Sequence, residues 1–401
     1  MDDQETMIIK PIRLGLIGCG IRLRSVLRLL MQCAPAGVLQ VRSVFDPDER
    51  ALQELSLVLG QEFLAGDRPA AVWESPDVDW VLIGSWNALH AQQSICALRA
   101  GKDVFCEKPL ATTFEDGLAI RDAVAESGRT FALGLVLRYS RHYQKIREIL
   151  DSGRLGKLIS MEFNETLAFN HGGHIYGNWR KESRVSGGHM LEKCCHDLDL
   201  ANWFANSLPM HVASFGGKDF FVPENAERMD EIGPNAEGVP AYKSWSKTCN
   251  DPDHPFLSGG DVLDNQVVIL EYANGVRASF HANSNAGIPE RRFYILGSHG
   301  SLRADLLSGS IEVCEIGWET RIETIALGET DGHGGGDEIM AQALYRTMRE
   351  QESPLASVRE GLCSMIVALG IDQACREKRV INLHSQWLDA GVLKAEDKPK
   401  P

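Results

Sequence analysis

The segment between residues 13 and 46 limits the possible folds of this chain more than any other stretch does. A short apolar run at 13–17 leads into Gly18-Cys19-Gly20, and a stretch with apolar residues at helical spacing follows. A second apolar run at 38–45 ends at Asp46. The order of strand, glycine turn, helix and strand predicts a βαβ unit, the building block of a doubly wound parallel sheet.

The glycine turn has the properties that binding of a dinucleotide requires. Gly18 permits a tight turn, and Gly20 lets backbone N–H groups approach a pyrophosphate at the positive end of the next helix. Ile21 and Arg22 begin that helix and are expected beside the same ligand. Leu23 replaces the third glycine of the usual fingerprint, so the helix and strand must pack differently here.

The residue that ends the second strand predicts which dinucleotide is bound. Asp46 lies 28 residues after Gly18, about where the acidic residue of a βαβ unit meets the adenosine ribose. Its carboxylate would accept hydrogen bonds from both ribose hydroxyls, whereas a 2′-phosphate would face a like charge. We therefore expect NAD(H) rather than NADP(H).

Three further buried-strand patterns follow, at 78–83, 103–106 and 130–136. In a doubly wound sheet the carboxyl ends of the strands line the ligand crevice. The polar and aromatic residues that follow two of these strands are therefore candidate cofactor contacts: Trp86, Asn87, His90, Glu107 and Lys108.

A second group of chemically capable residues lies between 186 and 199. Residues 190–204 have helical periodicity after a Gly-Gly break, so Glu192, His196 and Asp199 are predicted on one face of one helix. Glu192 would then hydrogen-bond one nitrogen of His196 and leave the other for a substrate hydroxyl. The alternative is an ordinary i,i+4 surface pair without a function.

These motifs together resemble the glucose–fructose oxidoreductase/inositol dehydrogenase/rhizopine catabolism (Gfo/Idh/MocA) family. The most specific mark is Glu107-Lys108-Pro109 after a strand, and the second is Gly187-Gly188 followed by His196 and Asp199. The family usually has Asp where this chain has Glu192. The resemblance extends from about residue 11 to about residue 385 and implies two domains. These are an NAD(P)-binding Rossmann domain at 1–136 and a substrate-binding, oligomer-forming α+β domain at 137–385.

The resemblance also implies roles for single residues. Lys108 and His196 would share proton transfer while a hydride passes to or from the nicotinamide, and Glu192 would orient His196. Lys108 can act near neutral pH only if the charge of NAD⁺ or desolvation lowers its pKa. Trp179 and Arg180 match a segment near the nicotinamide in some relatives. The remaining candidate substrate contacts are Arg138 and Tyr139 at the domain junction, Asp199, and His333 in a glycine-rich run that also reads as a plain flexible loop.

The second domain shows alternating strands at 158–163, 265–272, 275–283 and 292–296, which predict a large mixed, mainly antiparallel sheet. Helices near 339–351 and 357–377 are expected to pack back against the nucleotide domain. Residues 218–260 look like a long loop excursion, and 386–401 like a flexible tail. By analogy with the family, the open face of the sheet predicts a homodimer or homotetramer.

Composition excludes several other functions. A formal net charge of −14 disfavours nucleic acid and anionic membranes, and no apolar run reaches the ~18 residues of a bilayer span. Ten scattered cysteines predict no disulfide framework and favour a reducing cytoplasm. Cys194-Cys195-His196 lacks the spacing of a zinc site, so we expect no metal.

The leading hypothesis is an NAD(H)-dependent oxidoreductase acting on a secondary hydroxyl or ketone of a sugar, inositol or glycoside. Three alternatives stay open. One is a redox-neutral glycosidase that retains its NAD, and another is a non-enzymatic regulator that senses NAD or a sugar. The third is a reductase of a carbonyl such as a biliverdin or a keto sugar. A regulator need not keep Lys108 and His196, so their presence disfavours it.

Overall fold

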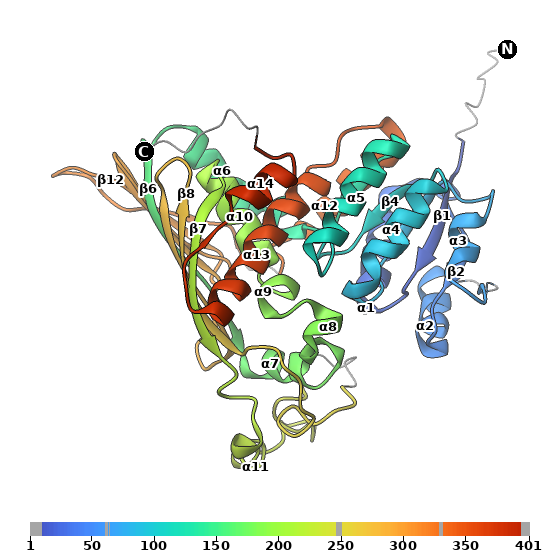
Figure 1. Cartoon of the computed structure of the whole chain (residues 1–401), viewed down its shortest axis with the longest axis horizontal. Coiled ribbons are helices and arrows are strands. Elements are labelled where there is room, and N and C mark those ends of the chain that lie inside the picture. Colours follow the sequence, from blue (N-terminus) through green and yellow to red (C-terminus); the bar gives the residue numbers. More distant parts are fainter. Residues whose placement is uncertain (1–9, 61–62, 64, 246–250, 329–331, 394–401) are drawn as a thin grey trace.

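The computed structural model describes residues 10–60, 63, 65–245, 251–328 and 332–393. The chain forms two sheets with helices between them (Figure 1). The first sheet has five strands in the order β2-β1-β3-β4-β5, all parallel. Its strands are β1 (Ile12–Ile17), β2 (Leu39–Phe45), β3 (Trp80–Ile83), β4 (Asp103–Cys106) and β5 (Phe131–Leu133).

The helices of the first sheet connect its strands, as the predicted βαβ pattern requires. They are α1 (Ile21–Cys33), α2 (Glu49–Leu59), α3 (Ala70–Glu74), α4 (His90–Arg99) and α5 (Phe114–Ser127). Local sequence fixes several of their ends. Helix α5, for example, begins where the Thr113 side chain accepts a hydrogen bond from the Asp116 N–H and ends at Gly128 with a positive φ.

The second sheet has nine strands in the order β13-β12-β11-β10-β6-β9-β8-β7-β14. Only its β6–β9 pair is parallel among the described pairings, so the sheet is mixed and mainly antiparallel, as predicted. Its strands are β6 (Leu158–Ala168), β7 (Pro209–Gly217), β8 (Asn265–Tyr272), β9 (Arg277–Ala286), β10 (Arg292–Gly297), β11 (Gly300–Asp305), β12 (Ser310–Glu315), β13 (Glu323–Ala326) and β14 (Ile381–Asn382).

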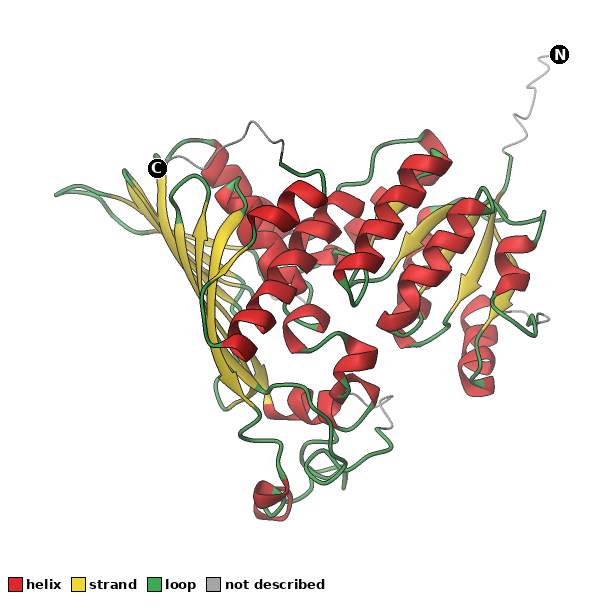
Figure 2. Ribbon diagram, viewed as in Figure 1, coloured by secondary structure: helices red, strands yellow, loops and turns green. Residues whose placement is uncertain are grey.

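Helices cover one face of this sheet, and the other face points away from them (Figure 2). The helices of this domain are α6 (Arg141–Asp151), α7 (Phe169–Tyr176), α8 (Ser183–Ser186), α9 (His189–Glu192), α10 (Cys195–Ala205), α11 (Arg228–Ile232), α12 (Gly336–Glu350), α13 (Val358–Glu377) and α14 (His384–Asp389). Short 3₁₀ turns are η1 (Asn87–Leu89), η2 (Val136–Tyr139), η3 (Trp179–Lys181) and η4 (Pro223–Asn225).

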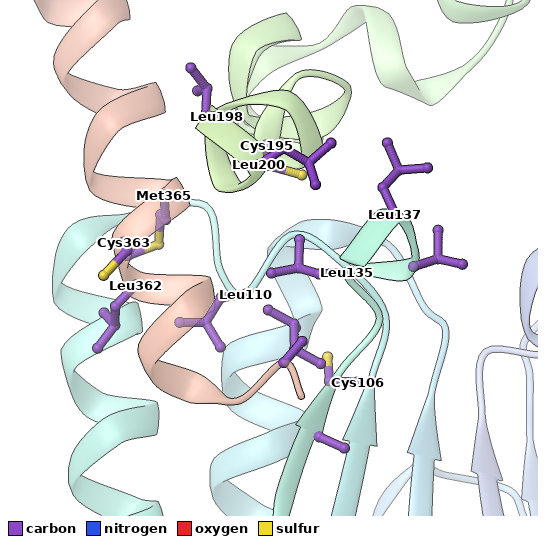
Figure 3. Close-up of a cluster of buried hydrophobic side chains, with 14 of the residues drawn as sticks. Cys106, Leu110, Leu135, Leu137, Cys195, Leu198, Leu200, Leu362, Cys363 and Met365 are labelled. Atoms are coloured by element: carbon purple, nitrogen blue, oxygen red, sulfur yellow. The ribbon is translucent and has the colours of Figure 1, made fainter. Parts of the chain in front are cut away.

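The last long helices join the two domains. Helix α12 packs against α1, and α13 packs against α5 as well as against α10 and β7. Figure 3 shows the apolar cluster at this junction, where Leu198 of α10 and Met365 of α13 lie above Cys106 at the end of β4. The carboxyl ends of the parallel strands therefore face α9 and α10, which carry the second sequence motif.

Two local predictions are wrong. The predicted helix at 190–204 is two helices, because α9 ends at Glu192 and α10 begins only at Cys195. The sequence predicts a flexible tail from residue 386, but α14 continues to Asp389. Trp387 in this helix is 0% exposed, and its Nε1–H donates to the Pro209 carbonyl oxygen at 2.7 Å. Residues 394–401 lie outside the described part of the chain.

Part of the excursion at 218–260 is packed, although η4 and α11 contain no buried residue. It contains η4 and α11, and it shares a second apolar core with α7. The buried members of this core are Leu167, Ile175, Tyr176, Phe221, Ala241, Tyr242, Phe256 and Val262. Because this core is separate from the main one, the excursion forms a small structured unit beside α7.

Candidate active site

The glycine turn after β1 provides the space that a dinucleotide phosphate needs. Gly18 has φ +77°, and a Cβ there would lie 2.4 Å from the Ser85 backbone nitrogen, so only glycine fits. At Gly20, where α1 begins, a Cβ would meet no atom within 4 Å, and no side chain caps the helix. Ile21 is exposed beside this opening. The turn therefore fits a pyrophosphate at the positive end of α1.

Arg22 and Asp46 occupy the two sides of this turn. Asp46 Oδ2 accepts from the Cys19 N–H at 2.5 Å, which fixes the carboxylate at the end of β2 beside the turn. Arg22 donates Nε–H to Glu107 at 2.9 Å and Nη1–H to Asp337 at 2.5 Å. Its buried Nη2 has no hydrogen-bond partner among the described residues. An unused buried donor next to Gly20 is suited to a phosphate oxygen.

Two residues predicted to contact the cofactor instead hold the loops of the site. Glu107 is buried, binds Arg22, and has its Oε2 3.3 Å from the Lys108 N–H. His90 is fully buried, with Nδ1 2.7 Å from the Pro109 oxygen and Nε2 3.1 Å from the Ser85 oxygen. Burial lowers the pKa of His90. Both side chains use their polar atoms within the protein, so they position Lys108 rather than bind a ligand.

Lys108 contacts Glu192 across the domain junction. Its Nζ donates to the Glu192 carbonyl oxygen at 2.6 Å and lies 3.4 Å from Glu192 Oε1, while Arg180 Nε lies 3.1 Å from the same Oε1. Burial acts to raise the pKa of Glu192, but the charges of Lys108, Arg180 and Lys193 outweigh it and lower this pKa. Glu192 is therefore an anion that holds two cations, and the predicted hydrogen bond from Glu192 to His196 is replaced by these contacts.

His196 lies at the start of α10 and is 4% exposed. Its Nδ1 has no hydrogen-bond partner within the described structure. Burial holds the pKa of His196 well below its ordinary value, and the charge of Lys108 adds to this effect. The imidazole is therefore neutral near physiological pH and can accept a proton.

Aromatic rings from both domains stack beside this cluster. Trp86, which precedes η1, stacks on Trp179 of η3 with ring centroids 5.8 Å apart. The guanidinium of Arg180 lies 4.5 Å from the centre of the Trp179 ring. The Asn87 side chain donates to the Ser186 carbonyl at 2.8 Å, so Asn87 joins the domains rather than pointing to the glycine turn.

Three residues predicted to contact the substrate make other contacts within the protein or line a different cavity. Arg138 and Asp199 form a buried two-point ion pair, with distances of 2.6 and 2.9 Å, and are each other's partners. Tyr139 is buried and lines a cavity of about 550 Å³ between α6 and α12 that Lys108 does not line. We therefore do not assign these three residues to substrate binding.

The sequence analysis missed one aromatic group near the site. His171 and His174 of α7 both stack on Trp245, at centroid distances of 4.4 and 4.6 Å, and Trp245 is 45% exposed. Asp251 binds His174 Nδ1 at 2.9 Å and thereby ties the excursion to α7. The only local signal was the pair of histidines three residues apart, because Trp245 is 71 residues further along the chain.

Two family models match the two halves of the chain. Residues 12–135 match the model described as "Oxidoreductase family, NAD-binding Rossmann fold", and residues 143–303 match the GFO/IDH/MocA C-terminal domain. The chain belongs to the GFO/IDH/MocA oxidoreductase family. Its NAD-binding domain therefore contains the glycine turn, Asp46 and Lys108 described above.

Several members of the GFO/IDH/MocA family are similar to this chain. YteT of Bacillus subtilis (strain 168), named as an oxidoreductase, is 24% identical over 77% of this chain and 81% of its own length. The 2,7-anhydro-N-acetylneuraminate hydratase of Escherichia coli (strain K12) is 25% identical over 68% of this chain and 63% of its own length. Inositol 2-dehydrogenase 3 of Saccharopolyspora erythraea is 36% identical, over 36% of this chain and 42% of its own length.

Solved structures share the fold of this protein over nearly its whole length. Levoglucosan dehydrogenase in complex with NADH and levoglucosan matches with a TM-score of 0.75 and 19% identity. The match covers 93% of this chain and 99% of that protein. At this identity the likeness establishes the fold.

Neither a metal cluster nor a membrane-spanning helix is found in the described residues. No group of three or more His, Cys, Asp or Glu side chains in those ranges is arranged to hold an ion. No helix there is long and apolar enough to cross a bilayer.

Proposed function

We propose that this protein is an NAD(H)-dependent oxidoreductase that acts on a secondary hydroxyl or ketone of a polyhydroxylated substrate. One observation carries the proposal. Lys108, at the end of β4 in the NAD-binding domain, donates to the Glu192 carbonyl oxygen at the end of α9, and the buried His196 follows four residues later in the first turn of α10. A proton donor and a proton acceptor thus lie together where the parallel strands end.

The contacts suggest how Lys108 and His196 divide the work. An ammonium has three N–H donors, and two of those on Lys108 are directed to Glu192. The third can stabilise the substrate oxygen as its negative charge develops, while neutral His196 accepts the hydroxyl proton. When bound, NAD(H) accepts or supplies the hydride. In the reductive direction the same two groups return the proton to the oxygen.

The substrate class is proposed from the relatives and from the site. Inositol 2-dehydrogenase 3 and levoglucosan dehydrogenase are named for polyhydroxylated ring substrates. In this chain, the exposed faces of Trp86 and Trp245 are suited to the apolar face of a sugar ring. We therefore propose an inositol, a free sugar or a glycoside.

A substrate panel tests this proposal directly. Inositols, aldoses and glycosides are incubated with NAD⁺ and separately with NADP⁺, and NADH or NADPH is followed by absorbance. We expect NAD⁺-dependent oxidation of at least one polyhydroxylated compound. Failure of every compound, with NADH binding retained, would contradict the proposed dehydrogenase activity.

A redox-neutral reaction is the second candidate. The Escherichia coli relative is named a hydratase, and a hydration involves no net oxidation or reduction. The same Lys108, His196 and bound NAD would serve a glycosidase that oxidises its sugar transiently. Release of the aglycone from a glycoside without accumulation of NADH would favour this reaction over a net dehydrogenase.

Replacing Asp46 by alanine is expected to weaken NADH binding and to reduce the preference for NAD⁺ over NADP⁺. The carboxylate is held at the end of β2 by the Cys19 N–H, where it can accept from ribose hydroxyls and repel a 2′-phosphate. Fluorescence titration with NADH and NADPH measures both effects. Asp48→Ala is the matched control, because Asp48 lies two residues away and only caps α2. An unchanged preference in Asp46→Ala would mean that Asp46 does not contact the ribose.

The uncovered face of the nine-stranded sheet supports a homodimer or homotetramer. Phe215 of β7 lies opposite Val267 of β8, and both are exposed together with Ile269. Apolar side chains gathered on an open sheet face are typical of a subunit interface. Ile269→Lys is expected to lower the molar mass measured by light scattering, whereas Ile232→Lys on α11 leaves it unchanged. A wild-type monomer would contradict this proposal.

We also propose the reducing cytoplasm as the compartment. All nine cysteines in the described residues are free, and five of them are buried.

A further inference from the structure

The glycine run at the start of α12 fixes the position of His333 near α10, the helix that contains His196. A Cβ at Gly334 would lie 2.3 Å from Ser140 Oγ, and one at Gly336 would lie 2.7 Å from the Val136 oxygen. The run therefore packs directly on η2, which a chain with larger side chains could not do. This packing places the ring of His333 6.5 Å from that of His196, measured between ring centroids.

A charged network orients His333. Its Nδ1 lies 2.8 Å from Asp337 Oδ2, and the other oxygen of Asp337 accepts from Arg22 at 2.5 Å. Burial acts to raise the pKa of Asp337, but the His333 hydrogen bond and the Arg22 charge outweigh it and lower this pKa. Asp337 is thus an anion, and its carboxylate takes the Nδ1 side of the His333 ring. Nε2 is the ring nitrogen on the side away from Asp337.

The proposed reaction leaves His196 with a proton that it must lose before the next turnover. His196 is 4% exposed, so it has little direct access to bulk water. The His333 side chain is 33% exposed. One hydroxyl or water can bridge two rings at this separation, because each hydrogen bond spans about 2.8 Å.

We propose that His333 is a proton-relay residue that connects His196 with solvent. During oxidation the substrate hydroxyl loses its proton to His196, which passes a proton to Nε2 of His333, and His333 releases it to water. The substrate carbon gives its hydride to NAD⁺, so each turnover yields one ketone, one NADH and one proton in solution. Reduction uses the same path in the opposite direction. This inference rests on the proposed function.

The test uses chemical rescue, which a purely structural role of His333 would not show. In a weakly buffered assay, His333→Ala is expected to lower kcat by about 100-fold, the lower end of the range for a positioned proton-transfer group. Added imidazole is expected to restore much of that loss, while KM and NADH affinity stay near the wild-type values. The variant is expected to fold, because Asp337 keeps its ion pair with Arg22.

Two further variants sharpen the result. His333→Gln keeps a side chain of similar size without a titratable nitrogen, so it is expected to show the same loss and the same rescue. His211→Ala is the matched control, since His211 is a part-exposed histidine paired with Glu271 at 3.2 Å on the sheet domain, and it is expected to show neither effect.

Three results would overturn the relay. One is a wild-type kcat in His333→Ala, and the second is a lost rate that imidazole does not restore. The third is a raised KM with unchanged kcat, which would make His333 a substrate contact. A wild-type protein that binds NADH but oxidises no compound of the panel would overturn the proposed function as well, and is recognised before any variant is made.

Discussion

Lys108→Ala is expected to lower kcat by about 1,000-fold, within the range for loss of a positioned acid–base group. The substitution removes the N–H donor that faces the substrate oxygen, and alanine cannot replace it. NADH affinity is expected to change little, because the glycine turn and Asp46 remain intact. Steady-state kinetics and NADH fluorescence titration measure the two quantities separately.

Lys102→Ala is the control for this substitution. Lys102 belongs to the same domain, and its Nζ donates to the backbone oxygens of Ser75 and Val78 at 2.8 Å. Its loss is expected to reduce stability without a comparable loss of kcat. If Lys108→Ala keeps more than half of the wild-type kcat, Lys108 does not stabilise the charge that develops on the substrate oxygen.

Arg291→Ala is expected to lower the free energy of unfolding by about 3–5 kcal/mol, the usual effect of removing one partner of a buried ion pair. Arg291 binds Asp197 of α10 at 2.8 and 2.7 Å and Glu165 of β6 at 3.1 Å, and all three side chains are buried. Without the guanidinium, two carboxylates remain in the interior, and Lys193 lies 3.4 Å from one of them, Glu165. Urea and thermal unfolding measure the loss.

The loss in Arg291→Ala is expected to grow with pH. Burial and Glu165 raise the pKa of Asp197 to about 7 against the opposing effect of Arg291. A carboxyl whose pKa is raised by folding contributes stability at low pH and loses it as pH rises through the folded-state value. The variant lacks the Arg291 guanidinium, which favours the ionised form of Asp197. Its loss of unfolding free energy relative to the wild type is therefore larger above pH 7 than below it.

Arg303→Ala provides the comparison for an exposed pair. Arg303 binds Glu312 on the sheet, and its side chain is more than half exposed. Its removal is expected to cost less than about 1 kcal/mol. Equal losses in the two variants would mean that the buried network contributes no more to stability than a surface pair does.

The sequence predicts the nucleotide-binding half well because its signals are local. The turn at Gly18 and the buried strands each occupy a few consecutive residues, and the order of parallel strands follows from the connecting helices. The alternating strands β6, β8, β9 and β10 are likewise predicted near their observed bounds. The strands β7, β11, β12 and β13 are not predicted, although buried and less buried positions alternate in β11 and at the start of β12.

The sequence predicts which residue types form the candidate site, but it does not predict which side chains bind one another there. Arg138 and Asp199 are 61 positions apart, and Arg22 and Asp337 are 315 apart, so no local pattern links them. A charged residue at a strand end suits a ligand and a buried ion pair equally well. The break between α9 and α10 is not predicted for a similar reason. Residues 190–204 are helix-compatible throughout, and the carbonyl oxygen of Glu192, the last residue of α9, accepts from Lys108, 84 positions earlier in the chain.

Helix α12 packs on α1, and the Arg22–Asp337 ion pair joins the two helices. The amino-terminal half has its own helices, but part of α1 is covered by α12, which begins more than 300 residues later. A fragment that ended after β13 would leave the apolar side of the first helix open to water. The two halves are therefore interleaved rather than joined end to end, and exchange of one half between relatives would have to carry the last helices along with the first sheet.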